Sequence, residues 1–260
     1  MIIGISGLCI DPSGACRIAG AGKSSVSSLL CATHSFVELA FSDVMKRFCQ
    51  EVFEFTDEQL WGESEKRVLP DARYQRPLTP PSKPEDGGDV EYLTPRFALQ
   101  TLGDGWGRGC YSRVWIDYAI RIIQRLQEGG YTYDPKTGLR SCIYLQDDPM
   151  VRPKTNVVVS DLRYFNEAEA IKAAGGKLVR VRRLTNIRFT SEQMNNAHGS
   201  EVELPQWDDD KFDYILGNSG PVDDLPGLVK HMVSILSGRV VAYDAEQADV
   251  PPFKRRPRTC

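Results

Sequence analysis

The sequence contains few residues of the kinds that build metal sites or disulfide frameworks. It has three histidines, and its seven cysteines are scattered, odd in number and without a Cys-x-x-Cys pair. This usage argues against a metal site held by imidazoles, against a zinc site and against a disulfide framework. We therefore expect the chemistry of this protein to depend on other side chains.

The sequence also lacks a long apolar run and an excess of one charge. Lysine and arginine number 32 against 35 acidic residues, a formal net charge of −3, so no global attraction to DNA or to acidic membranes is expected. No apolar run approaches the roughly 20 residues that a membrane helix requires. The opening run, residues 1–10, has no basic segment before it. We expect a soluble cytoplasmic protein without membrane contact or stable nucleic-acid binding, in which any anion site is local.

The order of the expected elements indicates an α/β protein. The 260 residues are 41% hydrophobic, enough for a substantial core. Residues 1–5 read as a strand, followed by a loop and a helix over 24–30. Residues 156–160, 166–174 and 178–181 read as strand, helix and strand, a unit that implies parallel strands with a right-handed crossover. Further elements are expected at 95–102 (helix), 111–127 (helix), 213–216 (strand) and 222–236 (helix).

Several segments do not resemble core sequence. Residues 70–90 are rich in proline, glycine and charge and are expected to form a loop or insertion. Residues 131–154 contain several turn signals and are expected to include a small hairpin. We expect one domain over residues 1–240 and a flexible basic tail over 241–260; a nucleic-acid-binding arm is the alternative for this tail.

A glycine-rich loop precedes the first expected helix. Gly22-Lys23-Ser24 follows an apolar strand and begins a helix, which is the context of a P-loop that cradles phosphates. The motif requires a glycine where Arg17 stands. Omitting residues 9–18 joins Gly7-Leu8 to Ala19-Gly20-Ala21-Gly22-Lys23-Ser24 and completes the loop. The ATP-binding residues predicted from this loop are Gly7, Gly20, Gly22, Lys23, Ser24 and Ser25.

The ten intervening residues contain a turn sequence. Asp11-Pro12-Ser13-Gly14 suits a type I turn, so residues 9–18 are expected to leave and re-enter the loop as a hairpin. On this interpretation their deletion changes stability by less than about 2 kcal/mol and spares ATP binding. The alternative is that Gly-Lys-Ser is a chance tripeptide at a helix start.

An acidic residue ends a later strand. Asp161 follows the apolar run 157–159, and in parallel sheets the carboxyl ends of strands meet the ligand crevice. We expect Asp161, with the Ser24 hydroxyl, to bind Mg²⁺, or Asp161 to orient a phosphate acceptor, and Arg163 to reach a phosphate. A helix cap and a surface arginine are the alternatives.

Three further stretches accompany the loop in a fixed order. They are 94–103 (TPRFALQTLG) followed by 106–108 (WGR) and 112–115 (SRVW); 160–163 (SDLR) with 166–170 (NEAEA) and 175–176 (GG); and His198 and 200–201 (SE) with 213–215 (DYI), Asn218 and Leu225. With the loop, these stretches resemble the bacteriophage deoxynucleoside monophosphate kinases over residues 1 to about 236. The segments 9–18, 70–90, 131–154 and the tail depart from that pattern.

The resemblance implies phosphoryl transfer from ATP to a deoxynucleoside monophosphate with Mg²⁺, which supplies precursors for phage DNA synthesis in the host cytoplasm. It implies a P-loop kinase fold with a helical monophosphate-binding insertion and a lid, and allows a homodimer. Catalytic residues would be Lys23, Asp161, Arg163 and Arg113, and further ATP contacts would be Arg183 and Asn218. Acceptor-binding residues would be Asp43, Arg96, Gln100, Trp106 and Arg108. Two alternatives stay open: a kinase for another small phosphorylated acceptor, and a nucleotide-binding protein with weak or no catalysis.

Overall fold

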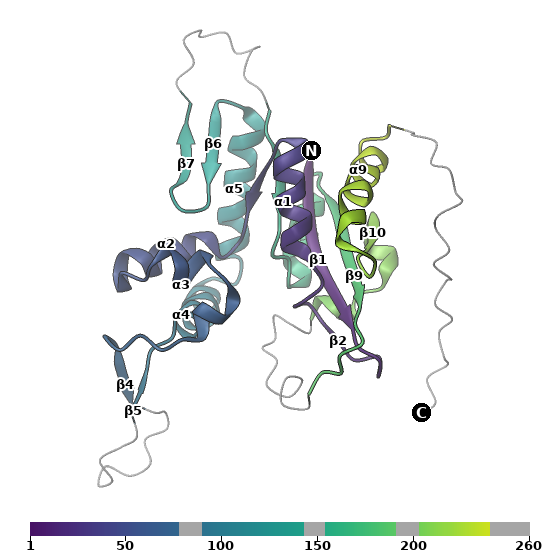
Figure 1. Ribbon diagram of the computed structural model, residues 1–260. Helices are drawn as coiled ribbons and strands as arrows, with labels where there is room; N and C mark the ends of the chain where they lie inside the picture. Colours follow the sequence, from purple (N-terminus) through teal and green to yellow (C-terminus); the bar gives the residue numbers. More distant parts are fainter. Residues whose placement is uncertain (78–89, 143–153, 191–202, 240–260) are drawn as a thin grey trace.

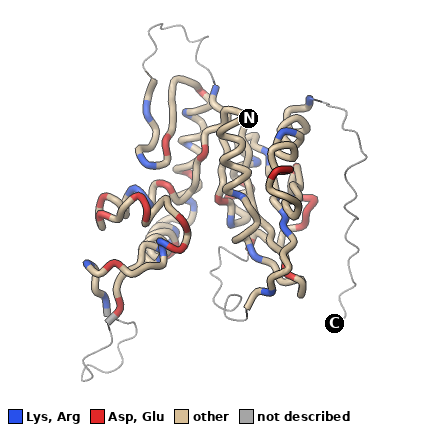
Figure 2. The backbone as a smooth tube through the Cα atoms, in the orientation of Figure 1, with Lys and Arg blue, Asp and Glu red and all other residues tan. Residues whose placement is uncertain are grey.

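The structure is a computed structural model that describes residues 1–77, 90–142, 154–190 and 203–239 (Figure 1). The predictions for His198, for residues 200–201, for most of the lid and for the tail fall outside these residues. Figure 2 shows acidic and basic residues interspersed along the chain, as the near-neutral composition predicts. In the described ranges, no helix has the length and apolar character needed to cross a membrane.

A mostly parallel sheet forms the centre of the molecule. Five parallel strands follow the order β10-β9-β1-β8-β3, and the short strand β2 pairs antiparallel with the end of β1. The strands are β1 (Ile2–Ile10), β2 (Cys16–Arg17), β3 (Phe36–Leu39), β8 (Asn156–Val159), β9 (Lys177–Leu184) and β10 (Tyr214–Gly217). The middle strand β1 therefore lies between β8 and β9, two strands that come much later in the chain. The carboxyl ends of these three parallel strands lie at the same edge of the sheet.

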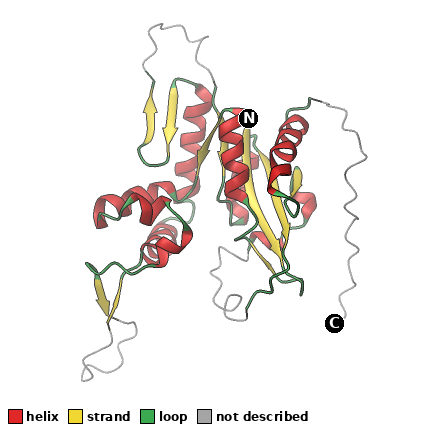
Figure 3. Ribbon diagram, viewed as in Figure 1, coloured by secondary structure: helices red, strands yellow, loops and turns green. Residues whose placement is uncertain are grey.

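Alternate residues of the strands face opposite helical layers, because side chains in a strand alternate between the two faces of the sheet. On one face Ile3, Ile5 and Val158 pack with α1 (Lys23–His34) and α9 (Leu225–Leu236). On the other face Ile2 and Val157 pack with α5 (Val114–Glu128) and α6 (Phe165–Ala173). This three-layer α/β arrangement (Figure 3) is the expected one and is consistent with a P-loop kinase fold.

The chain between β3 and α5 forms a helical part with a small core of its own. Its elements are α2 (Asp43–Phe53), α3 (Asp57–Trp61), η1 (Ser64–Val68), β4 (Gln75–Pro77), β5 (Val90–Tyr92), α4 (Pro95–Gln100) and the π-helical stretch η2 (Thr101–Arg108). Cys49, Phe55, Leu60 and Ala98 form the buried centre of this part. In Figure 1 it extends to one side of the sheet, at the lower left.

A hairpin packs against this helical part. Strands β6 (Tyr131–Asp134) and β7 (Gly138–Ser141) pair antiparallel, which confirms the hairpin expected in residues 131–154. Arg47 of α2 holds it: its guanidinium donates to Pro135 O (2.7 Å), and to the hydroxyls of Tyr118 (2.7 Å) and Tyr133 (3.3 Å).

Some expected bounds were wrong. The first strand does not stop at Ile5 but continues to Ile10, because β1 pairs with β9 as far as Ile10 opposite Leu184. The first helix runs to His34 instead of residue 30. The last helix begins at Leu225, after the 3₁₀ turn η6 (Val222–Asp224). Two further 3₁₀ turns, η4 (Leu204–Gln206) and η5 (Asp209–Lys211), precede β10.

Candidate active site

The glycine-rich loop joins β2 to α1 and lies directly over β1. The predicted hairpin is present: Cys9 pairs with Arg17 and Ile10 with Cys16. Gly7 therefore lies within β1 and does not end it, contrary to the sequence interpretation. A Cβ on Gly7 would lie 2.5 Å from Ile18 O and 3.1 Å from Lys23 Nζ. The absence of a side chain at Gly7 thus lets the loop settle on the strand.

Hydrogen bonds from the side chains of Lys23 and Asn218 hold the two ends of this loop. Lys23 Nζ donates to Ile18 O at 3.0 Å, and Asn218 Nδ2, beyond the end of β10, donates to Ala21 O at 2.9 Å. Gly22, the cap of α1, has a φ of 93°, and a Cβ there would lie 2.1 Å from Asn218 Nδ2. Glycine is therefore required at position 22 by both conformation and space. The first turn of α1, with the exposed Ser24 and Ser25, directs backbone N–H groups toward this loop.

Strand β9 carries three arginines, of which the resemblance implies Arg183 as an ATP contact, and the structure separates their surroundings. Arg183 is exposed and its Nη1 lies 3.4 Å from Gly20 O, so it reaches the loop. Arg180 is buried, and it donates to Asp209 (2.8 Å), Trp207 O (2.9 Å) and Leu204 O (3.0 Å). Arg182 pairs with Asp209 as well. Arg180 and Arg182 therefore fix the segment before β10 to the sheet.

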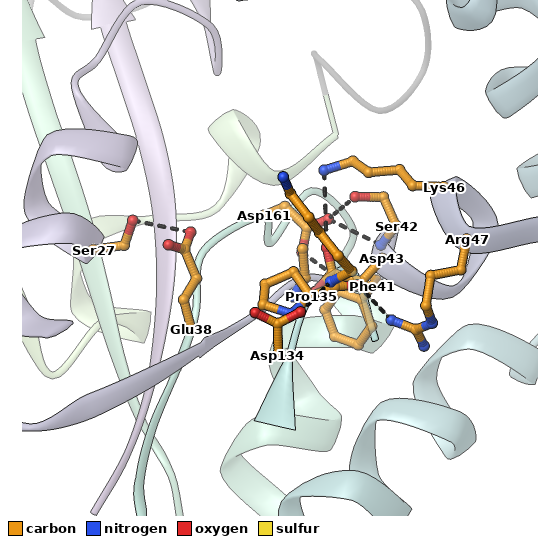
Figure 4. Close-up of polar contacts among 12 residues, drawn as sticks. Ser27, Glu38, Phe41, Ser42, Asp43, Lys46, Arg47, Asp134, Pro135 and Asp161 are labelled. Atoms are coloured by element: carbon orange, nitrogen blue, oxygen red, sulfur yellow. Dashed lines mark hydrogen bonds and ion pairs between the residues drawn. The ribbon is translucent and has the colours of Figure 1, made fainter. Parts of the chain in front are cut away.

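Asp161 lies where the ends of β8 and β3 meet. Its carboxylate accepts hydrogen bonds from Phe41 N (2.9 Å), Ser42 Oγ (3.1 Å) and Ser42 N (3.3 Å) (Figure 4). Leu162 N donates to Ile5 O (3.3 Å), so the turn after β8 runs beside β1. The predicted acid is thus at the carboxyl edge of the sheet, next to the strand that leads to the loop.

Glu38, Asp43 and Lys46 surround this turn. Glu38 Oε1 lies 3.0 Å from Ser27 Oγ of α1, and Lys46 Nζ lies 3.8 Å from Asp43 Oδ1 (Figure 4). Burial lowers the pKa of Lys46, while Asp43 and Asp161 raise it. Asp43 is buried and accepts hydrogen bonds from Ala40 N (2.8 Å) and the Tyr133 hydroxyl (3.1 Å). These contacts hold the start of α2.

The burial of Asp43 predicts a pH-dependent stability. Burial raises the pKa of Asp43 from its ordinary 3.8 to about 6, with Lys46 opposing the shift. The folded state therefore holds this proton more tightly than the unfolded chain does. Its stabilising effect is fully present below the unfolded pKa and is lost as the pH rises through about 6. Two pKa units correspond to on the order of 2 to 3 kcal/mol.

Urea unfolding between about pH 4 and pH 7 measures this effect. We expect the wild type to lose stability over this interval relative to Asp43→Asn, which cannot titrate. Asp223→Asn, at an exposed position, is the matched control and should follow the wild type. Parallel pH profiles for the wild type and Asp43→Asn would contradict the prediction.

A cluster of three arginines, one of them two residues after Asp161, joins three separate segments. Arg67 comes from η1, Arg96 from α4 and Arg163 from the turn after β8. Burial lowers the pKa of Arg67, and the nearby charges of Arg96 and Arg163 lower it further. Arg67 Nη2 donates to Gly62 O (3.1 Å), while its Nε is buried without a hydrogen-bond partner among the described residues. Like charges gathered in this way favour an anion.

The sequence had indicated Arg96 and Arg163 but not Arg67. No local pattern marks Arg67, because its 3₁₀ turn has no amphipathic period. Lys46 is not among the residues predicted from the sequence either. Arg67 and Lys46 are identified as candidate site residues only from the charged side chains that the fold places around them.

The remaining predicted acceptor residues have varied surroundings. Arg108 is held by Glu167 (2.6 Å) and Asp104 (3.2 Å) and stacks on Tyr164 at 3.8 Å. Arg113 pairs with Asp117, one turn along α5, at 3.0 Å. Gln100 and Trp106 are exposed, Trp106 to 59%. The fold thus brings Arg96 and Arg163 near Arg67, and it pairs Arg108 and Arg113 with acidic neighbours.

The chain has a viral relative. It is 29% identical over 205 residues, which are 79% of this chain and 86% of the relative, to a protein of Acanthamoeba polyphaga mimivirus named "Putative deoxynucleotide monophosphate kinase". No protein-family model matches the chain. With the three-layer sheet and the loop after β1, this distant similarity supports a relationship to the kinases.

Proposed function

We propose that the protein transfers the γ-phosphoryl group of ATP to a deoxynucleoside monophosphate and yields ADP and the diphosphate. The observation that carries this proposal is that the fold forms two groups of basic side chains, each of which suits a phosphate. One lies at the glycine-rich loop at the start of α1, and the other is the cluster of Arg67, Arg96 and Arg163. A transfer between two phosphorylated molecules requires such a pair of centres. The name of the viral relative agrees with this reaction.

The loop is the proposed donor site. Backbone N–H groups of the loop and the first turn of α1 suit phosphate oxygens. Lys23 Nζ rests on Ile18 O at 3.0 Å, a contact that it can exchange for a phosphate oxygen when ATP binds. Arg183, beside Gly20 O, adds a second cation at the same loop.

The arginine cluster is the proposed acceptor site. Guanidinium groups bind phosphate through paired N–H donors, and Arg67 Nε is a donor without a hydrogen-bond partner among the described residues. Gln100 and Trp106 are exposed on the neighbouring helical segment, and an amide and an indole plane suit the edge and the face of a base. Arg108 and Arg113 require release from their acidic partners before they can contact substrate.

The donor set also fits Mg²⁺. This ion keeps several waters and is bound chiefly by substrate phosphates with one or two protein oxygens. The exposed Ser24 hydroxyl and the Asp161 carboxylate would hold it, and Asp161, whose oxygens accept hydrogen bonds from Phe41 and Ser42, would do so through water. When bound, Mg²⁺ would neutralise phosphate charge. The protein's own contribution is to align the two phosphates, since an ionised acceptor has no proton to remove.

Coupled ADP production with dAMP, dGMP, dCMP and dTMP in turn tests the proposed reaction. In the same assay, Arg67→Ala and Arg96→Ala are expected to raise the KM for the monophosphate about tenfold or more, because each removes a charged hydrogen bond to the acceptor. The KM for ATP should stay close to that of the wild type.

Arg140→Ala on β7 is the matched control, because Arg140 is exposed on the hairpin away from both centres. Turnover only with a different phosphorylated acceptor would replace the proposed substrate. ATP binding without turnover on any acceptor would indicate a nucleotide-binding protein instead of a kinase.

A further inference from the structure

The inserted hairpin brings an additional cation to the glycine-rich loop. Arg17 on β2 lies opposite Cys9 of β1, and Cys9 Sγ lies 3.8 Å from the position of a Cβ on Gly20. Burial raises the pKa of the Cys9 thiol, and the charges of Arg17, Arg183 and Lys23 act in the opposite direction. Three cations therefore gather around one buried atom beside the loop.

The side chain of Arg17 points at the loop. Its Nη2 lies 3.7 Å from the position of a Cβ on Gly20, and its guanidinium lies over the ring of Phe189 at 4.3 Å. Its Nε is buried and has no hydrogen-bond partner in the described ranges. Within those same ranges neither Arg17 nor Arg183 forms an ion pair with an acidic side chain.

The hairpin holds Arg17 in a fixed place. The Asp11 carboxylate accepts hydrogen bonds from Ser13 N (2.8 Å), Ser13 Oγ (2.6 Å), Ala15 N (2.9 Å) and Phe189 N (3.0 Å). Thr185 N donates to Ile10 O at 2.9 Å. These bonds fix the hairpin to the segment after β9. The charge of Asp11 raises the pKa of the Cys9 thiol, but the Asp11 oxygens already accept the hydrogen bonds from Ser13, Ala15 and Phe189.

We propose that Arg17 is a phosphate-binding residue, which the inserted hairpin contributes to the donor site beside Lys23 and Arg183. The inference rests on the proposed function in one respect, that the loop binds the phosphates of ATP. The Phe189 ring holds the flat guanidinium with its Nη2 beside Gly20, and little side-chain freedom remains to be lost on binding. The hairpin then extends the phosphate cradle and is not a mere interruption of the motif.

Binding of ATP and of adenosine to Arg17→Met, Arg17→Lys and the wild type, measured by calorimetry, tests this role. Methionine keeps an apolar side chain against Phe189 but removes the charge. We expect Arg17→Met to bind ATP on the order of tenfold more weakly, to bind adenosine as the wild type does, and to melt at the wild-type temperature. Lysine should restore part of the ATP affinity, and Arg140→Met should have no effect.

Salt dependence adds a second readout. Loss of a phosphate contact should reduce the sensitivity of ATP affinity to ionic strength in Arg17→Met but not in Arg17→Lys. Wild-type ATP affinity in Arg17→Met would overturn the proposal. So would an affinity loss matched by a lower melting temperature in both variants, which would make Arg17 a structural residue. Arg17-dependent ATP binding by a wild type that phosphorylates no monophosphate would refute the proposed reaction and support the role of Arg17.

Discussion

Replacing Lys23 by alanine is expected to reduce phosphoryl transfer about a hundredfold or more and to leave the fold intact. The ammonium donates to a loop carbonyl, Ile18 O, and Lys23 is the first residue of α1, where it can reach the phosphates of a bound nucleotide. Loss of one preorganised charge at such a position costs on the order of 3 kcal/mol in the transition state. The substitution removes the hydrogen bond to Ile18 O and leaves the buried core between α1 and the sheet unchanged.

Coupled ADP production and thermal unfolding measure the two halves of this expectation. Lys230→Ala is the matched control, because Lys230 is exposed on α9. If Lys23→Ala turns over at close to the wild-type rate, the loop is not the donor site. A large fall in melting temperature would instead give Lys23 a structural role.

Local pattern was sufficient for four of the five parallel strands and for the position of the loop, but not for β3 (Phe36–Leu39). Runs such as 157–159 are apolar and β-branched, and the structure buries all three of their residues. The acid after this run lies at the carboxyl edge because parallel strands all end there. The bounds of β1 were harder to predict, because Gly4 and Gly7 interrupt its apolar pattern and only its pairing with β9 shows that the strand continues.

The arginine cluster shows what local pattern does not contain. Arg67, Arg96 and Arg163 lie on three elements far apart in the sequence, and each alone resembles a surface arginine. Their meeting depends on how η1 and α4 pack beside the turn after β8. The same limit applies to Arg17. In the sequence it stands where the motif requires a glycine, and only the pairing of β2 with β1 shows that its side chain lies beside Gly20.

The inserted segment contributes more to the fold than its turn sequence predicts. Cys9 and Ile10 extend the pairing of β1 with β9, opposite Arg183 and Leu184. Ile18 is completely buried in the core beneath α5 and α6, and its carbonyl oxygen is the acceptor for Lys23. Removing a buried isoleucine alone typically costs 2 to 5 kcal/mol. The expectation that residues 9–18 are dispensable therefore does not suit this structure.

Deleting residues 9–18 is expected to destabilise the protein by about 5 kcal/mol or more and to abolish ATP binding, because it removes strand pairs, a core residue and Arg17 together. Urea unfolding and calorimetry with ATP measure both effects. A shorter deletion is the control: Asn-Gly in place of residues 11–15 closes a two-residue turn between Ile10 and Cys16, which already pair. It loses the bond from Phe189 N to Asp11 but keeps Arg17, Ile18 and the bond from Thr185 N to Ile10 O, so it should fold and bind ATP. If the full deletion also folds and binds ATP like the wild type, the hairpin is a surface addition, and the phosphate-binding loop does not extend beyond Ala19 into residues 9–18.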